Sequence, residues 1–94
     1  MGKSAVLLSP RFLAALKKLN NADVTRVQGA LRVLPDCFGQ PHRHAGMSIR
    51  RLRQNIFECR AALKVRILLR ANAQALDVSF VGNHGEVRRL IRHL

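Results

Sequence analysis

The chain has 94 residues, of which 48% are hydrophobic, so we expect one folded domain over residues 1–94 rather than a disordered basic tail. Seventeen lysines and arginines oppose five acidic residues, and the formal net charge is +12. A domain this basic usually binds a polyanion or an acidic protein. The sequence shows no signal peptide and no apolar run long enough to span a bilayer, which favours a cytoplasmic protein with reduced thiols.

The first half of the chain predicts a short strand followed by two helices. Residues 5–9 can form the strand, and Ser9 and Pro10 suit the N-cap and first position of a helix. Apolar residues recur at helical spacing again along 23–34, which predicts the second helix. We expect Pro35 to end that helix and to open a loop, because proline lacks the backbone N–H that a helix interior needs.

The second half predicts successive strands. Residues 57–70 alternate between an apolar set and a mostly charged set, and their length indicates two strands with a reversal near 61–64. Residues 75–82 alternate in the same way, and the basic stretch 48–54, which precedes both, can open a strand. Strands that follow one another through short connections form an antiparallel sheet.

The C-terminal stretch predicts a third helix over residues 83–94. Asn83 can cap it, and Glu86 stands where a capping box needs an acid. The fold class is therefore α+β, with an N-terminal helix hairpin packed on a small antiparallel sheet and a C-terminal helix. We expect the helices to cover one sheet face and to leave the charged face open.

The charged set of the alternating stretch is the strongest functional signal. Residues two apart on a strand share a face, so Arg60, Lys64, Arg66 and Arg70 are expected to lie together, with Glu58 among them. A merely solvated face would carry mixed charges, because like charges on neighbouring strands repel. Four cations against one acid favour a surface that binds phosphates through arginine side chains.

Two other groups of residues carry side chains that could take part in chemistry. His84 follows the last strand and could act as an acid or base near neutral pH, and Glu58 could either share that role or serve only as an ion-pair partner of an arginine. His42 and His44 lie near Cys37, but their spacing matches no zinc pattern. No metal or other cofactor is indicated.

Three motifs in a fixed order resemble the RelE/ParE superfamily of type II toxin–antitoxin toxins. They are FECR at 57–60, KVRILLR at 64–70 and FVGNHGEVRRLI at 80–91, and the likeness covers nearly the whole chain. The resemblance implies a small α+β fold with a curved antiparallel sheet and neutralisation by an acidic antitoxin. RelE-like members cut mRNA in the ribosomal A site, whereas ParE-like members poison DNA gyrase.

The resemblance also implies roles for single residues. Arg66 matches the arginine that RelE-like enzymes place on the scissile phosphate, and His84 falls where the family has a basic residue or histidine. The chain departs from RelE at Ile56 and Glu58, where RelE carries lysines, and at Arg88, where RelE-like toxins often have a catalytic tyrosine.

The resulting prediction is a toxin that acts as a ribosome-dependent, metal-independent mRNA endoribonuclease. The predicted catalytic residues are Arg66, His84 and Glu58. The predicted RNA-binding residues are Arg60, Lys64, Arg70, Arg50 and Arg53. A gyrase inhibitor of the ParE type and a non-toxic basic nucleic-acid-binding module are the alternatives. The apolar stripe of the C-terminal helix or the helix hairpin is a candidate docking site for the antitoxin, although an ordinary core role is the favoured interpretation of that stripe, which consists of Val87, Leu90, Ile91 and Leu94.

Overall fold

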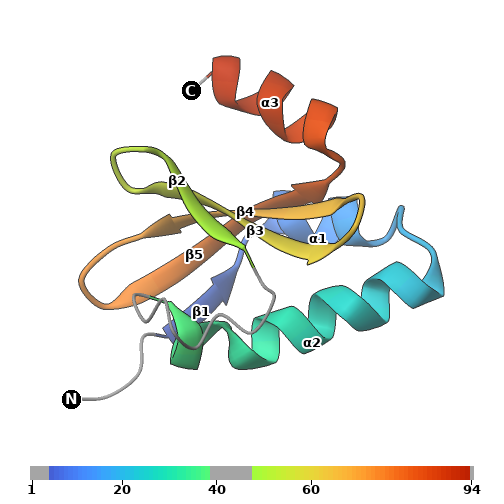
Figure 1. The fold of residues 1–94 in the computed structure, drawn as a ribbon, viewed down its shortest axis with the longest axis horizontal. Helices are drawn as coiled ribbons and strands as arrows, with labels where there is room; N and C mark the ends of the chain where they lie inside the picture. The colour runs from blue at the N-terminus through green and yellow to red at the C-terminus, as the bar shows by residue number, and fades with distance from the viewer. Residues whose placement is uncertain (1–4, 39–47, 94) are drawn as a thin grey trace.

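The computed structural model describes residues 5–38 and 48–93 (Figure 1). Five strands and three helices follow one another in the order β1 (Ala5–Leu8), α1 (Pro10–Leu16), α2 (Asn21–Cys37), β2 (Ile49–Arg53), β3 (Ile56–Ala62), β4 (Val65–Ala71), β5 (Ala75–Gly82) and α3 (His84–Arg92). Within these ranges, no helix combines the length and the apolar character that crossing a membrane requires.

The strands form one sheet in the order β1-β5-β4-β3-β2. Strands β2 to β5 pair antiparallel with their sequence neighbours, as predicted, and the reversal between β3 and β4 falls at Leu63 and Lys64. Strand β1 instead pairs parallel with β5, so the sheet is mixed. The α+β class is confirmed, and the parallel pair lies at the edge of the sheet, joining strands that are far apart in the sequence.

Helices α1 and α2 cover one face of the sheet. Ser9 and Asn20 cap them, each accepting a hydrogen bond from a backbone N–H in the first turn. The core on this face contains fully buried side chains from both helices and from the three central strands, including Phe12, Val27, Leu34, Cys59, Ile67, Leu69 and Val78. Cys59 is therefore a core residue, as its place in the apolar set predicted.

The prediction that Pro35 ends the second helix is wrong. Helix α2 continues through Pro35 to Cys37, and the N–H of Phe38 still donates to the carbonyl of Leu34. The apolar stripe explains the continuation, because Leu34 and Cys37 on either side of the proline are both buried against the sheet. That burial offsets the hydrogen bond which proline cannot make.

Helix α3 lies on the opposite face of the sheet from α1 and α2, which corrects the expectation that all helices share one face (Figure 1). Val87 packs there on Ile56 and Leu68, and Phe80 and Leu90 join this smaller cluster. Leu68 belongs to the set that was expected to be charged and open, yet it is only 2% exposed. The second apolar cluster is what holds α3 on this face.

The start of α3 is set by the predicted capping box. The Asn83 side chain accepts from the N–H of Glu86 at 2.8 Å, and the Glu86 carboxylate accepts from the N–H of Asn83 at 2.9 Å. These two bonds place His84 directly after β5, at the first position of the helix.

Candidate nucleic-acid interface

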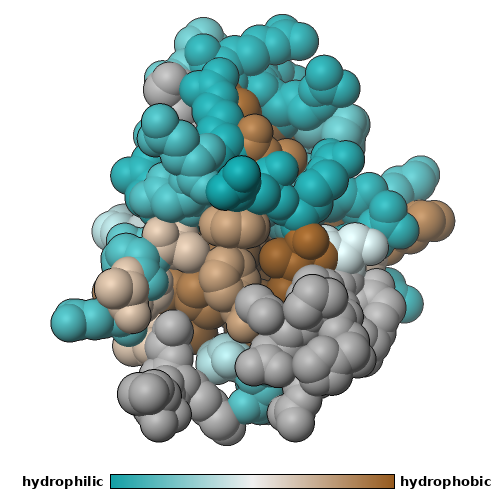
Figure 2. Space-filling model, turned by 60° about the vertical axis from the view of Figure 1, so that its left-hand side comes forward, coloured by the Kyte–Doolittle hydropathy of each residue, from teal (hydrophilic) through white to brown (hydrophobic). Residues whose placement is uncertain are grey.

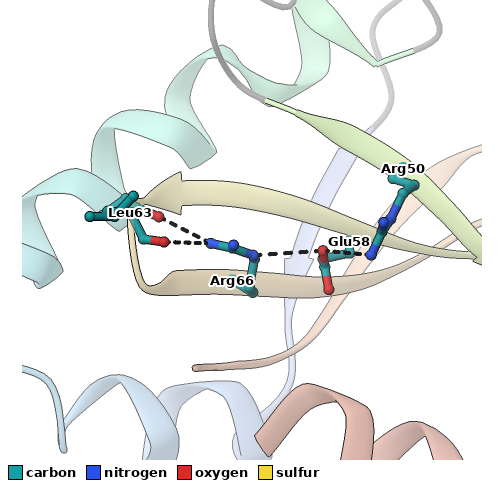
Figure 3. A network of polar contacts seen from close by, with 5 residues as sticks. Arg50, Glu58, Leu63 and Arg66 are labelled. Atoms are coloured by element: carbon teal, nitrogen blue, oxygen red, sulfur yellow. Dashed lines mark hydrogen bonds and ion pairs between the residues drawn. The ribbon is translucent and has the colours of Figure 1, made fainter. Parts of the chain in front are cut away.

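Glu58 on β3 is the only buried charged residue in the described part of the chain, with 7% of its surface exposed. Its Oε1 lies 3.5 Å from Nη2 of Arg50 on β2 and 3.7 Å from Nε of Arg66 on β4 (Figure 3). The second carboxylate oxygen points away from both arginines (Figure 3). A buried carboxylate needs such partners, because an unpaired charge inside a protein is costly.

Arg66 is held from both ends of its guanidinium group. Nη1 donates to the backbone carbonyls of Ala62, at 3.2 Å, and Leu63, at 3.0 Å, which close the β3–β4 turn (Figure 3). With Nε facing Glu58, three of the five N–H donors are directed at protein atoms, and those of Nη2 remain for a ligand. The Arg66 side chain is only 14% exposed, so its geometry is set before any ligand binds.

Two adjoining cavities surround this ion-pair network. The first has a volume of about 370 Å³ and is lined by Ser48, Arg50, Glu58, Arg60, Arg66 and His84. The second, of about 420 Å³, shares three of these residues and runs along α3, where it adds Leu52, Val87, Arg88, Ile91 and Arg92. We call the two cavities together the arginine cleft. Figure 2 shows hydrophilic side chains covering the α3 end of the molecule, with a few hydrophobic ones between them.

The arginine cleft brings together five of the predicted site residues, namely Arg50, Glu58, Arg60, Arg66 and His84. Arg60 stands directly opposite Arg66 in the β3–β4 pair. Five arginines and one histidine therefore line the cleft, against the single carboxylate of Glu58. This excess of positive charge suits a phosphate backbone.

Three predicted RNA contacts lie elsewhere. Lys64 is exposed on the β3–β4 turn and is not among the residues that line the cleft. Arg70 lies four residues beyond Arg66 on β4, about 13 Å along a strand, and lines a separate cavity with Arg53. The expectation that Arg70 sits with Arg66 is wrong, because Leu68 between them is covered by α3.

Arg88 and Arg92 are cleft residues that the sequence reasoning missed. They follow His84 at intervals of four residues, and side chains at this spacing share one side of a helix. The spacing of these three basic residues could have revealed the site, had the helix been expected on the charged face of the sheet.

The described residues contain no group of three histidine, cysteine or acidic side chains that could hold a metal ion. His42 and His44 lie outside the described residues. Cys37 and Cys59 are both buried and unbridged, and burial, with the nearby Cys37 and Glu58, raises the pKa of Cys59 to about 12. The Cys59 thiol is therefore protonated and unreactive at neutral pH.

Solved structures of toxin–antitoxin systems share this fold. RelE in the RelE–RelB complex of Pyrococcus horikoshii OT3 superimposes with a TM-score of 0.71 over 89% of this chain and 98% of that chain, at 14% identity. YafQ from E. coli gives 0.70 over 90% and 98%, at 10% identity, and YoeB from Staphylococcus aureus gives 0.65 over 88% and 99%, at 13% identity. No protein-family model and no curated protein sequence matches the chain.

At these identities the likeness concerns the fold. The chain has the fold of the RelE, YafQ and YoeB toxins of type II toxin–antitoxin systems, which confirms the predicted resemblance at the level of structure. RelE of Methanococcus jannaschii was solved in a complex with the antitoxin RelB, as was RelE of Pyrococcus horikoshii, and YafQ of E. coli was solved in a complex with DinJ.

Proposed function

We propose that this chain is the toxin of a toxin–antitoxin pair, that it cuts mRNA on the ribosome in the cytoplasm, and that an acidic antitoxin neutralises it. The observation that supports the proposal is the arginine cleft on a RelE-like fold, because Glu58, Arg66 and His84 all line its first cavity of about 370 Å³. Neither the fold nor the positive charge would favour cleavage without an acid–base pair beside the arginines.

The geometry supports a different catalytic role for each of these residues. Both ion pairs of Glu58 use Oε1, and its second oxygen forms no hydrogen bond with the described residues, so that oxygen can accept the proton of a ribose 2′-hydroxyl. The 2′-oxygen then attacks phosphorus, and protonated His84 donates a proton to the departing 5′-oxygen. Arg66 and Arg60 stabilise the negative charge of the phosphorane. The products are a 2′,3′-cyclic phosphate and a 5′-hydroxyl, and the step uses no metal.

The remaining cations would hold the RNA on either side of the reacting phosphate. Arg50, Arg88 and Arg92 line the cleft away from the β3–β4 turn, and Lys64 is exposed on that turn. Contacts of this kind bind phosphates without reading bases, so they would position mRNA while the ribosome supplies the reading frame.

The test is in-frame mRNA cleavage in a translating extract. Wild-type protein should cut, and His84→Ala should lower the cleavage rate by about 100-fold or more, the usual contribution of a general acid or base. Arg60→Ala should also lower it. Arg32→Ala is the matched control, because this exposed arginine lies on α2, on the other face of the sheet.

Other outcomes would point to the alternative functions. Accumulation of gyrase-cleaved DNA with intact mRNA would replace the nuclease with a gyrase inhibitor. Cutting that survives both Arg66→Ala and His84→Ala would contradict the assignment of these residues. Normal growth on expression without a partner gene would favour a non-toxic nucleic-acid-binding module.

A further inference from the structure

Helix α3 has a second flank, which faces away from the arginine cleft. His84, Arg88 and Arg92 line the cleft, whereas Arg89 and Leu90 point to the other side of the helix. Two cavities of about 250 Å³ each adjoin at Leu90 on this flank. We call them together the second groove; its lining includes Arg11, Ile56, Leu68, Arg70, Phe80, Glu86, Arg89, Leu90 and His93. The one acid among these, Glu86, is engaged in the capping box of α3.

The second groove differs from the cleft in chemistry. Its floor is apolar, formed by residues of the cluster beneath α3, including Leu68 and Leu90. Arg11 and Arg70 border this floor, and neither side chain forms a hydrogen bond or ion pair with any residue in 5–38 or 48–93. Asp77 stands opposite Arg70 on β5 but does not pair with it.

We propose that the second groove binds an acidic, amphipathic segment of a partner protein. A bulky apolar side chain of the segment enters the cavity over Leu68 and Leu90, and its carboxylates pair with Arg11 and Arg70. This inference rests on the proposed function in one respect, namely that the partner is the antitoxin. It divides the two flanks of α3 between two ligands, RNA on one side and protein on the other.

Charge and lining together select this occupant. A second copy of the chain is disfavoured, because each copy carries a net charge of +12. An RNA strand would match the arginines but would bring polar ribose and phosphate groups against an apolar floor. An amphipathic segment with acidic residues matches both features, because apolar anchors in a groove and complementary charges at its rim are the usual parts of helix recognition.

The test uses a fluorescein-labelled helical peptide with leucines at three- and four-residue spacing and glutamates elsewhere. Its controls are a peptide of the same composition in scrambled order and a labelled single-stranded RNA. Two charge-matched double variants are compared, Arg11→Ala with Arg70→Ala in the second groove and Arg50→Ala with Arg60→Ala in the cleft. Affinity is measured by fluorescence anisotropy at two salt concentrations.

The first double variant should weaken binding of the patterned peptide about tenfold, and the second should change it by less than about twofold. RNA binding should show the reverse dependence. Equal binding of the scrambled peptide, or equal losses in both double variants, would overturn the proposal by showing attraction through net charge alone. Loss of RNA binding in the first double variant would make the groove part of the nucleic-acid surface instead.

This measurement is independent of the nuclease assay, since it contains no ribosome. A chain that cuts no mRNA but binds the patterned peptide through Arg11 and Arg70 would contradict the proposed reaction and keep the docking site. A chain that cuts mRNA but does not bind the patterned peptide through these arginines would contradict the docking site and keep the proposed reaction.

Discussion

The two faces of the sheet differ in how much apolar core and how much charge they carry. The face under α1 and α2 carries a continuous buried core, with Ile67 and Leu69 fully enclosed. The face under α3 has only a small apolar cluster around Leu68, and charged residues occupy both flanks of the helix. The comparison suggests that one face supplies most of the stability, which leaves the other able to hold a buried carboxylate and unpaired arginines.

The largest expected effect is a loss of stability, and it compares the two faces directly through one leucine on each. Leu69→Ala should lower the free energy of unfolding by about 3–5 kcal/mol, because the enclosed core cannot collapse around the cavity. Leu68→Ala should cost less, about 2 kcal/mol, because α3 can shift toward the sheet. Urea unfolding measures both. Equal losses would show that the small cluster is as rigid as the main core.

Removing Glu58 should have the next largest effect. Glu58→Ala leaves the largely buried Arg66 without its carboxylate, and we expect a loss of about 2–3 kcal/mol. Glu58→Gln keeps a carbonyl oxygen near Arg66 and should cost about 1 kcal/mol. Chemical unfolding at low and high salt gives both values. A stabilising Glu58→Ala would mean that the buried carboxylate is retained for function at the expense of stability.

Alkaline pH tests the core under α1 and α2 through Cys59, whose pKa is raised from 9.0 to about 12. Because the folded state keeps the thiol protonated, its contribution is full below pH 9 and is lost as the pH rises from 9 toward 12. Between pH 8 and pH 10 the free energy of unfolding should fall by about 1.4 kcal/mol from this group. Cys59→Ala should remove that part of the slope, and an unchanged slope would assign it to other residues.

The smallest expected effect concerns the entry to α3. Asn83→Ala breaks one half of the capping box and should cost about 1 kcal/mol. The first turn, which carries His84, should then exchange its amide hydrogens faster than the last turn does. Asn20→Ala at α2 is the matched control on the other face, with a similar cost and no change in α3 exchange.

Local patterns predicted much of the fold because they depend on neighbouring residues. The capping box of α3 and the break between β3 and β4 follow from side chains a few positions apart. The parallel pairing of β1 with β5 could not be read in this way, because it joins segments about 70 residues apart. The prediction that Pro35 ends α2 was wrong for a related reason, since burial of Cys37 against the sheet outweighed the local preference of proline for ending a helix.

The candidate site also has a part that local sequence predicted and a part that depends on tertiary packing. Alternation along β3 and β4 was enough to place Glu58, Arg60 and Arg66 on one face, since side chains on a strand alternate by local geometry. Only the tertiary structure decided that α3 covers Leu68 and so separates Arg70 from Arg66. The same packing brought Arg88 and Arg92 to the cleft. The sequence by itself thus determined the strands, the caps and the positive charge, whereas the docking of α3, a balance of apolar contacts between distant segments, decided which charges share a site.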